Sequence, residues 1–277
     1  MIIEFTKMHG LGNDFVVIDA IRQEISLTPE QIRFIAARHF GVGCDQLLLV
    51  ELAAKHSDAD FRYRIFNADG SEVAQCGNGA RCFARFVRDK KLSYKDNILV
   101  DTQGGQLLLS FDDDGLITVN MGIPRHSPAI IPLRTEQEEK FYTVDVNGIE
   151  KAFGAVSMGN PHAVLKVNDV QLAQVSEIGE ALESHPFFPE RANIGFMQVI
   201  DRHTIKLRVY ERGTGETLAC GSGACAAVVI GIEQKLLDQD VIVELPGGKL
   251  KIHWEGRDKP VFMTGPAVSV FEGRVEV

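Results

Sequence analysis

RIFNADGSEVAQCGNGA, residues 64–80, and RVYERGTGETLACGSGA, residues 208–224, are two copies of one stretch, aligned without a gap. The copies share an arginine, a glutamate, a cysteine, two glycines and an alanine, at Arg64/Arg208, Glu72/Glu216, Cys76/Cys220, Gly77/Gly221, Gly79/Gly223 and Ala80/Ala224. Each cysteine precedes a glycine-rich turn at the start of a predicted helix. Duplicated domains tend to face each other across a pseudo-twofold axis, so we expect two equivalent thiols on opposite sides of one cleft.

The repeat extends over most of the chain. Gly12-Asn13 corresponds to Gly159-Asn160, Gln46 to Asn193, and residues 98–111 to residues 241–254. Matches in the same order indicate two homologous domains of ordinary size. We place the first at residues 1–120 and the second at residues 121–265, and the tail 266–277 has no counterpart in the repeat.

Composition narrows the class of protein. A chain of 277 residues with 45% hydrophobic content can bury two cores, while a formal charge of −9 and a pI near 5.4 argue against a nucleic-acid partner. No run approaches the roughly 20 apolar residues of a membrane span, and the N-terminus lacks the apolar segment of a signal peptide. Five cysteines, an odd number, favour reduced thiols. We therefore expect a cytoplasmic protein without nucleic-acid or membrane partners.

The pattern of elements predicts an α+β fold. Most segments read as short strands, and residues 28–31 read as a helix-capping box with proline at the first helical position. From Gly223 the second cysteine's helix is apolar on every side, which predicts a helix surrounded by strands. The first cysteine's helix, residues 80–91, carries Arg81, Arg85 and Arg88 apart from its apolar residues, so we expect it to be less enclosed.

The motif Cys-Gly-x-Gly-Ala predicts a reactive thiol beside an anion site. The glycines leave the first N–H groups of the helix unobstructed, and such groups bind anions and stabilise a thiolate. A cysteine here can have a pKa well below the usual value of about 8.5. A substrate carboxylate and the reactive sulfur would therefore share one anchor.

Two such thiols suit inversion of a stereocentre. Racemisation needs a base on one face of the carbon and an acid on the other, and a thiolate and a thiol can exchange these roles. Each sulfur would lie roughly 3–3.5 Å from the carbon, which puts the pair about 7 Å apart. The N–H groups would stabilise the charge that develops as the proton leaves.

The motifs resemble those of the diaminopimelate epimerase family over nearly the whole chain. The resemblance rests on MHGLGNDFVVID, RIFNADGSEVAQCGNGARC, SMGNPHAV, ERANIGF and YERGTGETLACGSGAC. It implies two pseudo-symmetric domains, each a β-barrel-like sheet wrapped around a central helix, with the last strand, within residues 266–277, returning to the first. It also implies a homodimer that interconverts LL- and meso-2,6-diaminopimelate without a cofactor, in the formation of lysine and peptidoglycan precursors.

The resemblance also implies roles for particular residues. Cys76 and Cys220 match the catalytic cysteines of the family, and His162 and Glu211 match the neighbours that modulate their pKa. Substrate contacts are implied at Asn13, Gln46, Asn67, Gly77, Asn78, Asn160, Asn193, Glu211, Arg212, Gly221 and Ser222. The tail carries Phe271 where some members have a tyrosine at their dimer contact.

The repeat itself loses its symmetry after the shared arginine. Asn67 stands opposite Glu211, and Ala68 stands opposite Arg212. A substrate with a second, non-reacting amino-acid end needs a carboxylate for its ammonium and a guanidinium for its carboxylate. Glu211 and Arg212 supply both.

Simpler interpretations exist for these residues. A single cysteine before a glycine-rich turn is more often a packing residue, and His162 alone would more often be a satisfied polar side chain. We expect Cys44, Cys82 and Cys225 to be structural. The sequence has no Cys-x₂-Cys pair to suggest zinc, so we expect no metal site. No Gly-Lys-Ser/Thr follows either glycine-rich turn to suggest phosphate binding.

Three functions follow from these features. The first is epimerisation of diaminopimelate. The second is racemisation of a mono-amino acid such as histidine or proline, which would keep both cysteines but need no partner for a distal carboxylate. The third is a non-catalytic amino-acid-binding module or a redox-sensing dithiol. Retention of both thiols together with Glu211 and Arg212 favours the first.

Overall fold

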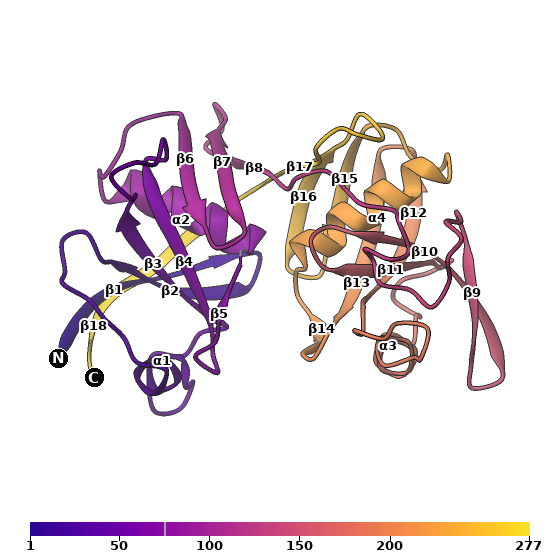
Figure 1. Ribbon diagram of the computed structural model, residues 1–277, viewed down its shortest axis with the longest axis horizontal. Helices are drawn as coiled ribbons and strands as arrows, with labels where there is room; N and C mark the ends of the chain where they lie inside the picture. Colours follow the sequence, from indigo (N-terminus) through magenta and orange to yellow (C-terminus); the bar gives the residue numbers. More distant parts are fainter. Residues whose placement is uncertain (75) are drawn as a thin grey trace. The chain divides into compact units, whose positions relative to one another are not determined.

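The computed structural model describes residues 1–74 and 76–277 and divides into two compact units. In Figure 1 the first runs from indigo to magenta and includes the yellow C-terminal strand, and the second runs from magenta to yellow. The first unit comprises residues 1–120 and 264–277, and the second comprises residues 121–263. The C-terminal segment therefore belongs to the unit in which the chain begins.

The first unit is a mixed sheet with two helices. Its elements are β1 (Ile2–Gly10), β2 (Asn13–Asp19), α1 (Pro29–Ala36), β3 (Gln46–Leu52), β4 (Phe61–Asn67), β5 (Glu72–Val73), α2 (Gly77–Asp89), β6 (Asn97–Thr102), β7 (Gly105–Phe111), β8 (Ile117–Asn120) and β18 (Val268–Glu276). The pairs β1–β2, β3–β4, β4–β5, β6–β7 and β7–β8 are antiparallel, while β2–β3 and β4–β6 are parallel.

The second unit repeats this pairing scheme. Its elements are β9 (Tyr142–Val146), β10 (Ile149–Ser157), β11 (Pro161–Lys166), α3 (Val175–Glu183), β12 (Asn193–Asp201), β13 (Thr204–Glu211), β14 (Gly215–Thr217), α4 (Gly221–Glu233), β15 (Asp240–Leu245) and β16 (Gly248–His253), and β17 (Phe262–Gly265) runs across the division between the units. The pairs β10–β11, β12–β13, β13–β14 and β15–β16 are antiparallel, while β11–β12 and β13–β15 are parallel. Strand for strand, this is the order found in the first unit, so the predicted α+β repeat is confirmed.

A central helix occupies the equivalent position in each unit. α2 contacts β1, β2, β3, β4, β7, β8 and β18, and α4 contacts β10, β11, β12, β13 and β16. In α4 the residues from Gly223 to Gly231 are buried all round, because its sequence offers no polar face. The predicted buried helix is thus confirmed, and Figure 1 shows α4 among the strands of its unit.

The prediction that α2 is less enclosed than α4 is confirmed at Arg85 and Arg88, which are not buried, but is wrong for Arg81. The helical spacing groups Arg81 with the more exposed Arg85 and Arg88, yet Arg81 is fully buried. Periodicity along one helix cannot reveal that a carbonyl from the far end of the chain, that of Pro266, supplies the guanidinium with a hydrogen-bond partner.

Local signals set the ends of other elements. α1 begins with the predicted capping box, in which the Thr28 hydroxyl accepts from the Gln31 N–H and the Gln31 side chain accepts from the Thr28 N–H. The parallel strands β2 and β11 are buried almost throughout, as strands covered on both faces require. Within the described residues, no helix is both long and apolar enough to cross a bilayer.

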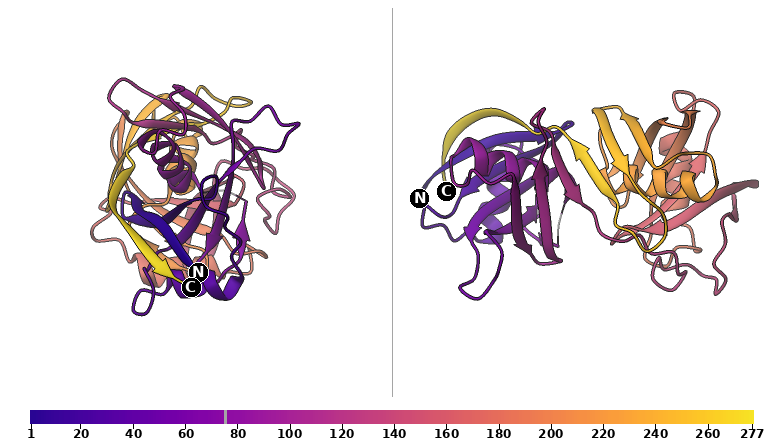
Figure 2. Two further views of the ribbon diagram at one scale, coloured as in Figure 1. Left: turned by 90° about the vertical axis from the view of Figure 1, so that its left-hand side faces the viewer. Right: turned by 90° about the horizontal axis from the view of Figure 1, so that it is seen from above.

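The C-terminal strand closes the first unit. β18 pairs antiparallel with β1 from Ile2↔Glu276 to His9↔Val268, with a bulge after Lys7. The Met1 ammonium donates to the Val277 carbonyl at 2.6 Å, and both views in Figure 2 show the two ends of the chain side by side.

Candidate active site

The first cysteine site lies at the start of α2. Cys76 is the N-cap residue, with an extended backbone (φ −144°, ψ 123°), and its side chain is half-buried. Its Sγ atom lies 3.8 Å from the Asn13 Oδ1 atom, and the Asn78 Nδ2 group donates to the same oxygen at 3.2 Å. The structure therefore brings three predicted site residues together around one amide oxygen.

A tight turn and an aspartate position Asn13. Leu11 and Gly12 both have positive φ angles, 58° and 90°, so the chain reverses between β1 and β2 just before Asn13. The Asn13 Nδ2 group donates to the Asp45 Oδ2 atom at 2.9 Å, and Arg38 holds the other Asp45 oxygen at 2.6 Å. Asp45 was missed in the sequence because only the β2–β3 pairing brings it beside Asn13.

Gln46 and Asn67 form a second pair in the first unit. They are direct partners across β3 and β4, and the Gln46 Nε2 group donates to the Asn67 Oδ1 atom at 3.0 Å. The Asn67 Nδ2 group donates in turn to the Ser71 hydroxyl at 3.2 Å. Both amides are thus oriented by hydrogen bonds, and they lie together where β3 begins and β4 ends.

The second cysteine site lies at the start of α4. Cys220 is the N-cap residue, with φ −106° and ψ 106°, and it is only 4% exposed. Its Sγ atom lies 3.7 Å from the Ser222 Oγ atom, which accepts from the Asn160 Nδ2 group at 3.3 Å. Asn160 corresponds to Asn13 in the repeat, and Ser222 corresponds to Asn78. The contact between Asn13 and Asn78 therefore recurs between Asn160 and Ser222, with a hydroxyl in place of one amide.

His162 fixes the orientation of Asn160. The imidazole is 1% exposed, and its Nε2 atom lies 3.0 Å from the Asn160 Oδ1 atom. Burial, aided by the positive charge of Arg212, lowers the pKa of His162 to about 3. The imidazole is therefore neutral near pH 7 and donates its Nε2–H to Asn160.

The lowered thiol pKa predicted from the sequence is wrong for Cys220. Burial raises the pKa of Cys220 well above its usual range, and the Glu211 carboxylate raises it further. Hydrogen bonds from the Gly223 N–H and the Ser222 hydroxyl act in the opposite direction but are outweighed. The helix start does bind the sulfur, yet a dry site beside a carboxylate keeps the proton on it.

Glu211 is the last residue of β13 and Arg212 follows it, and the two side chains differ in burial and in partners. The Glu211 carboxylate is partly buried and accepts from the Thr217 hydroxyl, whereas Arg212 is exposed. The Arg212 guanidinium donates to the Glu190 carbonyl at 3.0 Å through Nη1, and its backbone N–H donates to the Asn193 Oδ1 atom at 3.0 Å. Thr217 was missed in the sequence, although its position on the short strand before Cys220 could have suggested it.

Asn193 connects the predicted residues of the second site. It is 4% exposed, is the direct partner of His162 across β11 and β12, and donates to the Pro161 carbonyl at 3.0 Å. With its oxygen on the Arg212 N–H, the buried amide fixes the start of β12 against the end of β13. We therefore interpret Asn193 as a residue that supports the second cysteine site structurally.

The shared glycines are required by close contacts. A Cβ atom at Gly79 would lie 2.5 Å from the Tyr63 hydroxyl oxygen, and one at Gly223 would lie 3.1 Å from the Cys220 Sγ atom. The Tyr63 hydroxyl donates to the Cys76 carbonyl at 3.3 Å. Glycine at the fourth position of each Cys-Gly-x-Gly-Ala motif therefore lets the central helix begin against its sheet. Gly77 and Gly221 are the first helical residues.

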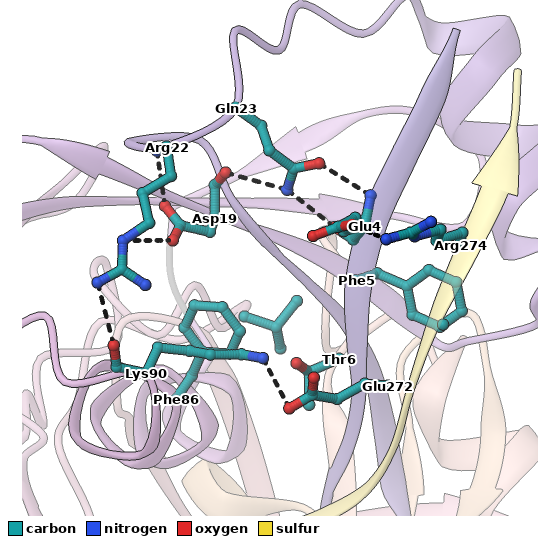
Figure 3. A pocket seen from close by; sticks show the side chains of 12 residues that line it. Glu4, Phe5, Thr6, Asp19, Arg22, Gln23, Phe86, Lys90, Glu272 and Arg274 are labelled. Carbon is teal, nitrogen blue, oxygen red and sulfur yellow. Dashed lines mark hydrogen bonds and ion pairs between the residues drawn. The ribbon is translucent and has the colours of Figure 1, made fainter.

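The pocket shown in Figure 3 lies elsewhere. It has a volume of about 420 Å³ and is bounded by β1, β2, the end of α2 and β18, and none of the predicted site residues lines it. Its charged groups pair with one another, as in Lys90–Glu272 and Glu4–Arg274, both at 2.7 Å. The candidate site is therefore assigned from the two cysteines and their contacts. Among the described residues, no group of three or more His, Cys, Asp or Glu side chains is placed to hold a metal ion.

Solved structures with the same architecture define the fold family. A phenazine biosynthesis protein of the PhzF family from Bacillus anthracis is 18% identical, with a TM-score of 0.72, and 100% of each chain is covered. A hydroxyproline epimerase from Agrobacterium vitis, solved with bound trans-4-hydroxy-L-proline, is 14% identical, with a TM-score of 0.71, covering 99% of this chain and 92% of that one. At these identities the likeness defines the fold alone.

The sequence comparisons define the family within that fold. The diaminopimelate epimerase profile matches residues 5–127 and 154–270. A diaminopimelate epimerase from Nitrosomonas europaea is 60% identical over 277 residues, covering 100% of both chains. This chain belongs to the diaminopimelate epimerase family.

Proposed function

We propose that the chain interconverts LL- and meso-2,6-diaminopimelate by proton transfer at one α-carbon. Full-length relatives at 56–60% identity bear the name diaminopimelate epimerase, which supports this isomerase activity. The observation that carries the mechanism is the cysteine that caps the central helix of each unit. Lysine and peptidoglycan precursor formation is the metabolic setting that this reaction implies.

In the proposed mechanism Cys76 and Cys220 act on opposite faces of the α-carbon. Once one of the two thiols has lost its proton to solvent, that sulfur takes the α-proton as a thiolate, and the other thiol gives its proton to the opposite face, so the charge on the pair is unchanged by the transfer. The N–H groups at the start of each central helix stabilise the carboxylate as negative charge develops on it. No cofactor is needed, because the helix starts supply the stabilising charge.

The asymmetry of the two sites supports a substrate with two amino-acid ends. The first site presents the neutral amides of Asn13, Asn67 and Asn78, whereas the second adds the charges of Glu211 and Arg212. We propose that Arg212, which is exposed, binds the distal carboxylate. Glu211 lies close enough to Cys220 to raise its pKa, so we assign it to the second thiol as well as to a substrate ammonium group.

Two further proposals concern the assembly and its compartment. β18 pairs with β1 along one edge and exposes Val268, Val270 and Phe271, which are 44%, 55% and 50% exposed. Apolar groups on an edge strand suit pairing with another copy, so we propose a homodimer formed there, tested by sedimentation of wild type and Phe271→Asp. All five cysteines are thiols, which suits the reducing cytoplasm.

The direct test is an assay of the purified chain with LL-diaminopimelate and no added pyridoxal phosphate. We expect meso-diaminopimelate to form until both isomers are present at equilibrium. Histidine and proline serve as matched mono-amino-acid substrates, and we expect poor turnover of both because they have no distal end for Arg212. Faster racemisation of either one, or no meso product, would contradict the proposal.

A further inference from the structure

The first cysteine site contains a chain of side-chain hydrogen bonds that runs in one direction. The Arg81 Nη2 group donates to the Asn78 Oδ1 atom at 2.9 Å, the Asn78 Nδ2 group donates to the Asn13 Oδ1 atom at 3.2 Å, and the Asn13 Nδ2 group donates to the Asp45 Oδ2 atom at 2.9 Å. Cys76 joins the chain at Asn13, where its Sγ atom lies 3.8 Å from the Oδ1 atom.

The two ends of this chain fix its direction. An amide group can rotate to exchange its donor and its acceptor, but a guanidinium can only donate and a carboxylate can only accept. With Arg81 at one end and Asp45 at the other, both asparagines must turn their oxygens toward Arg81. The Cys76 sulfur consequently faces an acceptor, which favours its protonated form as a hydrogen-bond donor.

Both ends are themselves held in place. Arg81 is fully buried, and it also donates to the carbonyls of Pro266, at 3.2 Å through Nε, and Gly77, at 3.5 Å through Nη1. Asp45 accepts from the Arg38 guanidinium at 2.6 Å and from the Asp14 N–H at 3.0 Å. A buried arginine is rare unless several groups accept from it, so its position is strongly specified.

In the second cysteine site the corresponding amide, that of Asn160, is turned the opposite way. There Asn160 turns its Nδ2 group toward Ser222 and its oxygen toward His162. The position that corresponds to Arg81 in the repeat is Cys225, which is buried and has no charged group that donates several hydrogen bonds as a guanidinium does. The equivalent asparagines thus present an acceptor to one helix start and a donor to the other.

We propose that Arg81 and Asp45 are positioning residues for Cys76, which act from the two ends of the amide chain to keep the Asn13 oxygen on the Cys76 sulfur. The proposal deepens the function proposed above and rests on it for the role of Cys76 in catalysis. Neither residue need touch substrate. They determine which partner the Cys76 sulfur meets when its proton is exchanged.

Two other titratable groups near Cys76, Tyr63 and Cys82, do not compete for this effect near neutral pH. Tyr63 donates to the Cys76 carbonyl, and burial raises its pKa well above the usual range. Burial likewise raises the pKa of Cys82, the next thiol along α2, to about 12. Both groups stay neutral, so the charges at the two ends of the amide chain are Arg81 and Asp45, and Asp45 is itself paired with Arg38.

The test is a double-mutant cycle in which the reactivity of the Cys76 thiol is measured. In wild type, Arg81→Met, Asp45→Leu and the double variant, the rate of Cys76 alkylation by iodoacetamide is measured against pH by peptide mass spectrometry, with Cys220 as the internal reference. The double variant removes one positive and one negative charge, so the net charge of the site is unchanged. Its amides are free to rotate and present N–H to the sulfur, which favours the thiolate.

We expect Cys76 in the double variant to react about tenfold faster at pH 7.5, because one hydrogen bond then favours the thiolate in place of the thiol. Each single change should give much less than half of this effect, since the other end still fixes the chain. The matched control is Arg85→Met/Asp89→Leu, which removes an exposed ion pair of 2.9 Å from the same helix and should leave Cys76 at its wild-type rate.

An unchanged Cys76 rate in the double variant, or strictly additive effects of the two single changes, would overturn the proposal. If Arg81→Met fails to fold, Asn78→Leu takes its place, because this change breaks the same chain one link later and keeps the guanidinium on Pro266 and Gly77. The readout does not require turnover. A chain that shows the expected Cys76 reactivity but does not epimerise diaminopimelate would contradict the proposed function alone.

Discussion

Asn13 and Asn160 occupy the same position in the two units, yet their amides are turned in opposite directions. Asn13 presents its oxygen to the start of α2, while Asn160 presents its N–H group to the start of α4. Arg81 and Asp45 impose the first orientation, and His162 imposes the second. The comparison teaches that duplication preserved the backbone frame around each cysteine, while the surrounding side chains give the two thiols different environments.

The comparison predicts its largest effect when either thiol is removed. Cys76→Ala and Cys220→Ala should each lower kcat for LL-diaminopimelate by about a thousandfold, the middle of the roughly 10²–10⁴-fold that a positioned acid or base contributes, because each face has only one. Each change removes one sulfur atom, so far-ultraviolet circular dichroism should match wild type. Cys82→Ala, a buried thiol on the same helix as Cys76, is the control and should keep its activity. Near wild-type turnover by either of the first two variants would show that one thiol suffices.

Arg212 provides the next largest difference between the sites, since Ala68 stands in its place in the first unit. Arg212→Ala should lower kcat/KM for diaminopimelate about a hundredfold, because a charge-assisted pair with a distal carboxylate is worth roughly 1.5–3 kcal/mol. Arg191→Ala, which removes another exposed arginine of the second unit, is the control. Retained activity in Arg212→Ala would mean that no distal carboxylate is bound there.

His162 should make the second unit more sensitive to acid, because Phe15 takes its place in the first. The folded pKa of His162, about 3, lies below the unfolded value near 6.5, so its contribution to stability is complete above pH 6.5 and is lost as the pH falls toward 3. Urea unfolding should show a loss of about 2 kcal/mol between pH 7 and pH 5 from this group. His162→Gln should reduce that loss, whereas the exposed His203→Gln should not. Equal pH dependence in the two variants would exclude His162 as the cause.

Glu211 should give the smallest of these effects. Because its charge raises the pKa of Cys220, Glu211→Gln should lower that pKa and accelerate modification of Cys220 at pH 8 by a small thiosulfonate severalfold, with Cys76 unchanged. Glu216→Gln, which removes a carboxylate paired with Arg208 in the same unit, controls for the loss of charge. If both variants behave alike, the effect is not specific to the carboxylate beside the sulfur.

The sequence was sufficient for features that depend on local pattern. The cysteines were predicted to begin the central helices because the same glycine-rich motif occurs twice, and α4 was predicted to be buried because its residues offer no polar face. The repeat likewise predicted the common pairing scheme. Each of these features depends on the sequence of one segment alone or on the comparison of two segments.

The features that were missed depend on contacts between distant segments. Arg81 is buried because Pro266, 185 residues away, and Asn78 accept from it. Asp45 meets Asn13 only through the β2–β3 pairing, and the pKa of Cys220 depends on burial and on a carboxylate from β13. Spacing in the sequence locates the thiols but does not give the charges and donors that the fold places around them.

The central claim, that two thiols act on opposite faces of one carbon, is tested most directly by the reaction in D₂O. LL-diaminopimelate is incubated with the wild-type chain, and the deuterium at the α-carbon of substrate and product is measured by mass spectrometry at early conversion. We predict deuterium in the meso product and almost none in the remaining LL substrate, because the proton is removed by one sulfur and a solvent-exchanged proton is delivered by the other. Meso product that retains the original proton would contradict the account, since a single group would then have carried that proton from one face to the other.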